Sequence, residues 1–304
     1  MNVVRILYRG SLSSCNYHCG YCPFAKTVNT RQQLRQDAQE VDRFVEWAAG
    51  GNRAMAILFT PWGEAIVHAH YRRAMVRLSR MPHVQRVALQ TNLSCGLQEF
   101  EEADRDALAF WATFHPTQVS LPQFVERCGV LDRMRIRYSV GVVGLREHID
   151  AIEELRRRLP PSIYVWINCN KREPHYYSEE ELSRLRRVDP YLDLNRRDYP
   201  SRGEACRAGE SVFTVDGEGD VRRCHFIDQQ LGNIYRDDIF ARLGARMCSN
   251  ATCGCHIGYV HRPALDLYRL FGDNVLERIP ADWPHVEAGF VAAEARETRD
   301  GSYR

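Results

Sequence analysis

The sequence has no long apolar run, no leader-like beginning and almost no net charge. No stretch of about 18 residues is continuously apolar, and the residues after Met1 lack the charged, apolar and small-residue order of a secretory leader. Lys and Arg number 41 against 39 Asp and Glu, a formal charge of +2 that gives no sign of a nucleic-acid partner. The 304 residues are 44% hydrophobic, which is enough for a full core. We therefore expect a globular cytoplasmic protein with no membrane association.

The sequence has no fourth cysteine close to the first three. Cys15, Cys19 and Cys22 are spaced C-x3-C-x2-C after an apolar run at 3–8. A 4Fe-4S cluster normally takes four cysteine ligands, so a tight triplet predicts an iron that is open to something other than protein. In the reducing cytosol, the eleven cysteines are expected to be metal ligands or buried thiols. Zinc is the alternative, although structural zinc sites usually present two separated ligand pairs, and His18 makes no such pair.

Strands and helices alternate along most of the chain. Apolar segments predict strands at 3–8, 54–59, 84–89, 112–114, 136–143 and 163–167. Helices are expected between Thr30 and Gly50 and at 65–80, 99–109, 123–131, 147–159 and 178–188, the last beginning with a capping-box pattern. This alternation predicts a parallel α/β sheet, and leaves open whether the sheet is doubly wound or a barrel. Both folds place sites at the carboxyl ends of their strands.

The triplet, with Tyr21 before its last cysteine, resembles the signature of radical S-adenosylmethionine enzymes. The resemblance implies a partial (β/α)6 TIM-like barrel with the cluster loop after its first strand. It also implies that S-adenosylmethionine chelates the open iron and is cleaved by one electron to a 5'-deoxyadenosyl radical, which abstracts hydrogen from a substrate. An electron donor such as flavodoxin or ferredoxin would then be a partner.

Two strand ends match further motifs of that family. Gly63 and Glu64, after the second strand, stand where relatives hold the amino group of S-adenosylmethionine, with Trp62 replacing the first glycine of the family turn. Thr91 and Asn92, after the third strand, resemble a segment near the ribose or carboxylate of the cofactor. Ordinary turn and capping roles are the alternatives.

Three later strands supply weaker candidates. His115 precedes a rigid proline, and is expected either to donate to a cofactor or substrate oxygen or to be a structural hydrogen-bond residue. Val142 lies on a glycine-containing strand similar to the one that packs against adenine in the family, and core packing is an equally good account. Asn168, at the end of the sixth strand, is a candidate of the same kind.

A second set of cysteines resembles the SPASM or twitch extension of the family, which holds an auxiliary 4Fe-4S cluster. Cys206 and Cys224 enclose an expected hairpin, with strands at 212–215 and 221–224 around the turn 216–217. Cys253 and Cys255 complete the first choice of ligands, and Cys248 is the alternative fourth ligand. A structural zinc site is the alternative for this set.

These observations predict three parts: a radical S-adenosylmethionine core at 1–200, an auxiliary-cluster region at 201–262 and a helical tail at 263–304. The resemblance favours a peptide or protein substrate. The alternatives are dehydrogenation of a small alcohol or cyclitol and, in another class, an iron-sulfur electron carrier or sensor without S-adenosylmethionine chemistry.

Overall fold

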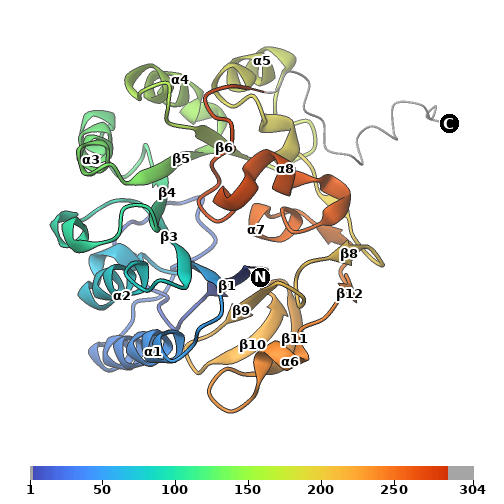
Figure 1. Ribbon diagram of the computed structural model, residues 1–304. Coiled ribbons are helices and arrows are strands. Elements are labelled where there is room, and N and C mark those ends of the chain that lie inside the picture. The colour runs from blue at the N-terminus through green and yellow to red at the C-terminus, as the bar shows by residue number, and fades with distance from the viewer. Residues whose placement is uncertain (1–2, 287–304) are drawn as a thin grey trace.

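The computed structural model describes residues 3–286, which form one nine-stranded sheet with helices on both sides (Figure 1). The strand order is β11-β10-β9-β1-β2-β3-β4-β5-β6. The core strands are β1 (Val4–Tyr8), β2 (Met55–Phe59), β3 (Val84–Thr91), β4 (Leu108–Phe114), β5 (Arg137–Gly144) and β6 (Val165–Cys169). Each pairs in parallel with the next. Sequential order without reversal excludes a doubly wound sheet and confirms the open, partial (β/α)6 barrel.

Helices cover the outer face of this sheet (Figure 1). They are α1 (Arg31–Ala49), α2 (Ala69–Ser79), α3 (Leu121–Met134), α4 (Ile149–Arg158) and α5 (Glu179–Val188), with short 3-10 turns at Ala65–Val67, Gln98–Glu102, Arg146–His148 and Leu192–Asn195. The expected cap at Thr30 and the expected capping box of Ser178 with Glu181 are present, and Thr30 also forms a capping box with Gln33. Within the described part of the chain, no helix combines the length and apolar composition that a membrane span requires.

The prediction of a helix at 99–109 is wrong. Only the turn Gln98–Glu102 is helical, and Leu108 already belongs to β4, where it pairs with Val87. Leu108 and Ala109 are fully buried on opposite faces of the sheet. Strand pairing and burial on both faces therefore override the local helix preference here.

The last part of the described chain covers the inner face of the sheet. Residues from α7 (His256–Tyr259) and α8 (Leu267–Phe271) pack against inner-face side chains such as Leu58, Trp111 and Trp166. Part of the segment expected as a tail thus lies inside the barrel, while residues 287–304 of that prediction lie outside the described residues. Both faces of the sheet are therefore buried, as expected for parallel strands.

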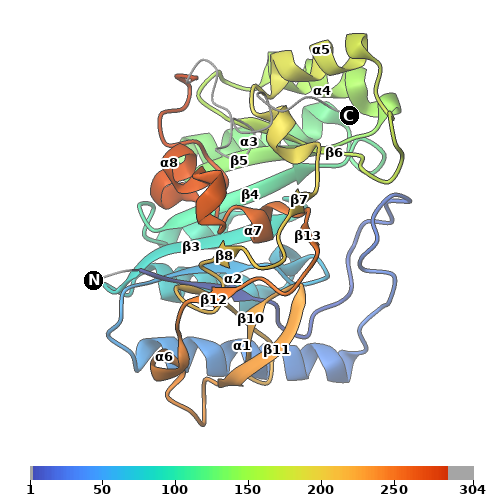
Figure 2. The same cartoon turned by 90° about the vertical axis from the view of Figure 1, so that its right-hand side faces the viewer.

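The expected hairpin extends the same sheet. Strands β9 (Val212–Val215) and β10 (Asp220–Cys224) are antiparallel, and β10 continues to β11 (Ile227–Asn233). β9 pairs in parallel with β1, which joins the auxiliary region to the barrel. Two short ladders follow, β7 (Tyr199–Pro200) with β13 (Thr252–Cys253) and β8 (Ala205–Cys206) with β12 (Arg246–Met247), and they run beside α7 (Figure 2).

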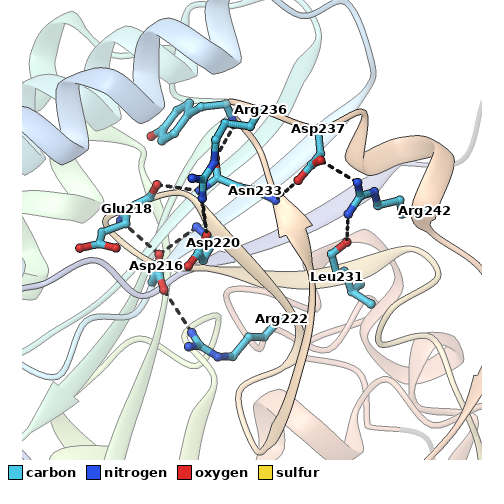
Figure 3. A network of polar contacts seen from close by, with 10 residues as sticks. Asp216, Glu218, Asp220, Arg222, Leu231, Asn233, Arg236, Asp237 and Arg242 are labelled. Atoms are coloured by element: carbon cyan, nitrogen blue, oxygen red, sulfur yellow. Dashed lines mark hydrogen bonds and ion pairs between the residues drawn. The ribbon is translucent and has the colours of Figure 1, made fainter.

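A network of charged side chains holds the hairpin ends together (Figure 3). Asp216 accepts hydrogen bonds from the backbone N–H groups of Glu218 and Asp220 and pairs with Arg222 at 3.1 Å. Asp237 accepts from the N–H of Asn233 and from Arg242 of α6 (Ile239–Arg242). Each carboxylate here has a cation and a backbone donor, so the network fixes the turn geometry.

Candidate active site

A cavity of about 530 Å³ opens at the carboxyl ends of the core strands. Its lining includes nearly all of the residues predicted for the catalytic site: Cys15, Cys19, Cys22, Gly63, Glu64, Thr91, Asn92, His115, Val142 and Asn168. Tyr21 lies directly behind, with its hydroxyl 2.9 Å from Nδ1 of His115. Strand ends that are distant in sequence thus meet around one space, as expected for a parallel barrel.

The cysteine loop is held in place by side chains outside it. Asn29 Oδ1 accepts from the backbone N–H groups of Ser13 and Ser14, both at 2.8 Å. Within the triplet, the N–H of His18 donates to Gln118 at 2.9 Å. Lys26 donates to the carbonyl of Cys19 at 3.1 Å. These bonds fix the backbone just before Cys15 and again at Cys19, so the protein itself orders the loop that carries the thiols.

The three thiols differ in exposure. Cys19 is buried, while Cys15 and Cys22 are half-buried at the cavity wall. Burial raises the pKa of Cys15 to about 11, although the N–H of Tyr17 donates to its sulfur at 3.3 Å. Burial also raises the pKa of Cys19, which Lys26 lowers in part. Cys15 is thus a thiol at neutral pH, and metal binding would have to displace its proton. Among residues 3–286, no three Cys, His, Asp or Glu side chains converge on the position of a single metal ion.

Gly63 is required by a close approach of two loops. A Cβ atom at this position would overlap the backbone of Ser14, and the N–H of Glu64 donates to the carbonyl of Ser14 at 3.0 Å. The turn is therefore attached directly to the cysteine loop. The neighbouring Trp62 leaves the contact undisturbed because its ring points outward, where Arg9 lies 3.9 Å over the ring centre.

Glu64 is buried and held by three donors. One carboxylate oxygen accepts from the hydroxyl of Thr91 at 2.7 Å and from the N–H of Ile66 at 3.2 Å, and the other accepts from the N–H of Asn92 at 2.7 Å. Burial raises the pKa of Glu64 to about 7, and the three hydrogen bonds lower it in part. A carboxylate offers about four lone-pair directions, so one remains for a further donor.

Asn92 also contacts the cysteine loop. Its amide donates to Oδ1 of Asn16 at 3.1 Å and lies 4.0 Å from the sulfur of Cys15. Thr91 and Asn92 thus contact Glu64 and the loop rather than standing free at the strand end. Their position supports a role in orienting the site, a role that the sequence did not indicate.

His115 bridges to the cysteine loop. Its Nδ1 lies 2.9 Å from the hydroxyl of Tyr21 and 3.4 Å from the sulfur of Cys19. Burial, together with the charge of His148, lowers the pKa of His115 to about 4, so the ring is neutral at physiological pH. A neutral imidazole with one nitrogen engaged can position Tyr21 and the loop.

The two remaining predicted residues face different sides of the sheet. Val142 lines the cavity, and its side chain is fully buried in the core between the sheet and the outer helices. The next residue of β5, Val143, is half-buried and also lines the cavity. Asn168 is exposed at the cavity wall, where Asn195 donates to its Oδ1 at 3.3 Å. Because neighbouring strand residues point to opposite faces, the packing of Val142 against adenine stays a prediction beside its role in the core.

The second set of cysteines divides into four and one. Burial raises the pKa of Cys253 to about 12, and the thiols of Cys224, Cys206, Cys248 and, with the smallest effect, Cys255 add to the rise. Burial also raises the pKa of Cys224 to about 11, with contributions from Cys206 and Cys248. Cys255 lines the central cavity, where its main charged neighbours are Lys171, Arg278 and Arg9. Cys248 thus affects both Cys224 and Cys253, whereas Cys255 affects only Cys253 and lines the cavity.

Several residues of the cavity were not predicted from the sequence. They are Arg9 after β1, the inner-face tryptophans Trp111 and Trp166, and Arg278 beyond α8. Trp166 lies two residues before Asn168, so strand alternation was a usable signal for it. No local sequence pattern indicated Arg278, because its segment reaches the cavity only through long-range packing.

Comparison with known proteins finds likenesses of fold at low identity. No family model and no curated protein matches the chain. Among solved structures, anSMEcpe with bound AdoMet is 12% identical, with 79% of each chain covered and a TM-score of 0.49. BtrN in complex with AdoMet and 2-DOIA is 14% identical over 79% of this chain and 84% of that one, with a TM-score of 0.32. These likenesses concern the fold alone.

Proposed function

We propose that the chain is a radical S-adenosylmethionine enzyme whose catalytic 4Fe-4S cluster is held by Cys15, Cys19 and Cys22. One observation carries the proposal: three thiols on one fixed loop and the anchored carboxylate of Glu64 line the same cavity at the strand ends. When bound, the cluster and S-adenosylmethionine supply a 5'-deoxyadenosyl radical. The protein's part is to bind, orient and shield these groups.

Glu64 is the proposed acceptor for the amino group of S-adenosylmethionine. One lone-pair direction of its carboxylate remains after the bonds from Thr91, Asn92 and Ile66. Its raised pKa means that a nearby ammonium group would stabilise the ionised form strongly. Thr91 and Asn92 then act by fixing this carboxylate beside the cysteine loop.

The auxiliary 4Fe-4S cluster is assigned to Cys206, Cys224, Cys248 and Cys253. The mutual influence of these thiols supports the set, and it replaces Cys255, our first choice from the sequence, with Cys248. Cys206 lies on β8, which pairs with β12, and Cys253 ends β13. Four thiolates from separate strands would complete the coordination of such a cluster.

A peptide or protein substrate is favoured by the rim of the cavity. Most of the exposed large apolar side chains among the described residues belong to its lining: Phe24, Val28, Trp62 and Phe226. Phe24 and Trp62 are in contact, with ring centres 4.5 Å apart. Apolar side chains gathered at an opening are typical of a surface that receives another chain or an apolar ligand.

The test is reductive cleavage of S-adenosylmethionine. The protein is reconstituted anaerobically with iron and sulfide and mixed with dithionite and S-adenosylmethionine. We expect 5'-deoxyadenosine and methionine to form, with no product when dithionite is left out. A fully loaded protein that forms neither product would contradict the proposal.

Spectroscopy of the same samples separates the enzyme from an electron carrier. In a carrier, every iron has a protein ligand, and the electron paramagnetic resonance signal of the reduced protein is unchanged by S-adenosylmethionine. In the proposed enzyme the signal of one cluster shifts on addition. A colourless protein that contains zinc would instead support a structural metal site.

A further inference from the structure

One basic residue of the cavity has no role in the proposed chemistry. Arg278 is 3% exposed and lines the cavity, yet among residues 3–286 it has no hydrogen bond or ion pair. Its Nε–H is buried without an acceptor. A buried guanidinium normally has an acid or several carbonyl groups around it, because transfer of an unpaired charge out of water is costly.

Aromatic rings hold this guanidinium without using its donors. Its central carbon lies 4.3 Å from the ring centre of Trp166 and 5.7 Å from that of Trp111. Such stacking is favourable, but it contacts the face of the guanidinium and leaves the N–H groups at its edge available. The arrangement therefore presents a flat, oriented set of donors beside two apolar rings.

Asp189 does not neutralise Arg278 by direct contact. Burial raises the pKa of Asp189 and the charge of Arg278 opposes the rise, but its oxygens accept from the hydroxyl of Tyr164 at 2.8 Å, from the N–H of Ile167 at 2.9 Å and from the N–H of Tyr191 at 3.0 Å. The carboxylate is thus engaged with another part of the fold. Within residues 3–286, the donors of Arg278 are left without an acceptor.

The backbone around Arg278 is fixed and strained. Its φ of 54° lies in the left-handed region, which residues other than glycine seldom adopt. The preceding Glu277 forms a buried ion pair with Arg86 at 2.9 Å, and its carbonyl accepts from the hydroxyl of Ser139 at 2.6 Å. Trp166 in turn donates to the same hydroxyl at 3.2 Å. One set of bonds therefore places both the arginine and the ring beneath it, as expected where strain serves a site.

Other cations stand around the same part of the cavity. Arg9 lines it, and Lys171 and Arg9 are with Arg278 the main charged neighbours of the exposed Cys255. Lys171 lies outside the cavity lining and pairs with Asp198 at 3.5 Å, so Arg9 and Arg278 supply the positive charge of the lining itself. Such a potential attracts an anion and repels a cation.

We propose that Arg278 binds an oxyanion of the substrate, a carboxylate or a phosphate, with the apolar part of the substrate on Trp111 and Trp166. That the bound anion belongs to the substrate depends on the proposed function, whereas the anion site itself depends on the geometry alone. A guanidinium fork matches both oxyanions in a bidentate manner. For a peptide substrate, the group recognised is an acidic side chain or a terminal carboxylate.

The experiment is calorimetric titration of the reconstituted protein under anaerobic conditions. Benzoate and phenyl phosphate serve as probes for the two oxyanions, and benzamide is the neutral counterpart. We expect at least one anion to bind about tenfold or more tightly than benzamide, as a charge-assisted hydrogen bond implies. The tighter of the two anions identifies the chemistry. Equal binding of all three probes overturns the proposal.

Three variants locate the site. Arg278→Gln is expected to lower the affinity for the preferred anion about tenfold and to leave the affinity for benzamide unchanged. Arg278→Lys should lose less affinity, because it keeps the positive charge although it lacks the two-pronged donor geometry of the guanidinium. Arg269→Gln is the matched control, an arginine of the same segment that pairs with Asp266 at 3.0 Å outside the cavity lining. If Arg278→Gln does not fold, Arg278→Lys decides. Anion binding to Arg278→Lys equal to that of the wild type would overturn the assignment.

Saturating S-adenosylmethionine separates cofactor from substrate. The affinity of the wild type for the anion should change less than about twofold, whereas competition would mean that the carboxylate of the cofactor uses Arg278 and would overturn the substrate assignment. These titrations involve no turnover. A failure to cleave S-adenosylmethionine therefore counts against the proposed function and leaves the anion site to be judged by its own result.

Discussion

The two groups of cysteines are held in different ways. Cys15, Cys19 and Cys22 lie on one loop whose backbone is fixed by Asn29, Gln118 and Lys26. The second group comes from separate segments: Cys206 and Cys253 lie in ladders of two residue pairs each, Cys224 ends β10 and Cys248 follows β12. Local bonds thus order the first group, whereas the second depends on long-range packing. Under the proposed function, an open cluster site would use a preformed loop, while a closed site would be assembled together with its metal.

Loss of one cysteine of the triplet should have the largest effect. Cys19→Ala leaves two ligands on the loop, and we expect cleavage of S-adenosylmethionine to fall by more than about 100-fold, beyond the range for residues that only support a metal ligand. The production of 5'-deoxyadenosine measures it. Cys128→Ala is the control, because that buried thiol belongs to α3 and packs in the core, away from the cavity. Similar losses in both variants would show that the effect is structural.

The next comparison concerns the fourth auxiliary ligand. Cys248→Ala should reduce the iron content from about eight to about four atoms per chain, whereas Cys255→Ala should keep it, since Cys248 affects the pKa of both Cys224 and Cys253 while Cys255 affects only that of Cys253. Iron and sulfide analysis after identical reconstitution decides. The reverse pattern would return Cys255 to the ligand set.

Glu64 gives a prediction about pH. Its pKa is about 7 in the folded protein against an ordinary value of 4.5, so the folded state resists ionisation that the unfolded chain undergoes freely. The free energy of unfolding of the wild type relative to Glu64→Gln should therefore be highest below pH 4.5 and fall by about 3 kcal/mol as the pH rises to 7. Chemical denaturation of both proteins between pH 4.5 and 8 checks this. A constant difference would mean that the carboxyl group is not desolvated.

The smallest effects are expected in the hairpin network. Asp216→Ala removes the acceptor of two backbone donors and of Arg222, and should cost about 1–2 kcal/mol of stability. Arg236→Ala removes only an exposed ion pair with Asp220, and should cost less than about 0.5 kcal/mol. Urea denaturation measures both, and both variants should still bind both clusters. Loss of the auxiliary cluster in Asp216→Ala would show that the turn also positions Cys224.

The order of elements and the triplet were accessible from the sequence because they depend on local patterns. Apolar runs, the capping residues Thr30 and Ser178 and the cysteine spacing are all read within a few residues. The strand-end candidates gathered because parallel strands end at one edge. The sequence thus predicted Glu64 and Asn92 as site residues but did not predict the hydrogen bond that the N–H of Asn92 donates to Glu64.

The features that were missed depend on direction or on distant packing. Val143 lines the cavity beside Val142, and an apolar run that is buried on both faces does not reveal which of two neighbouring valines faces a ligand. Cys253 ends a strand and Cys255 precedes a helix, so the chain turns between two thiols that only Gly254 separates in the sequence. Arg278 reaches the cavity through the buried pair of Glu277 with Arg86, a contact across most of the chain.

The cover of the inner face comes late in the chain, and this sets an order for biosynthesis. Leu58 and Trp111 lack their partners from α7 and α8 until more than two hundred residues after the triplet have left the ribosome. During translation the inner face of the sheet is accordingly uncovered, and it closes only when the segment of α7 and α8 folds onto it.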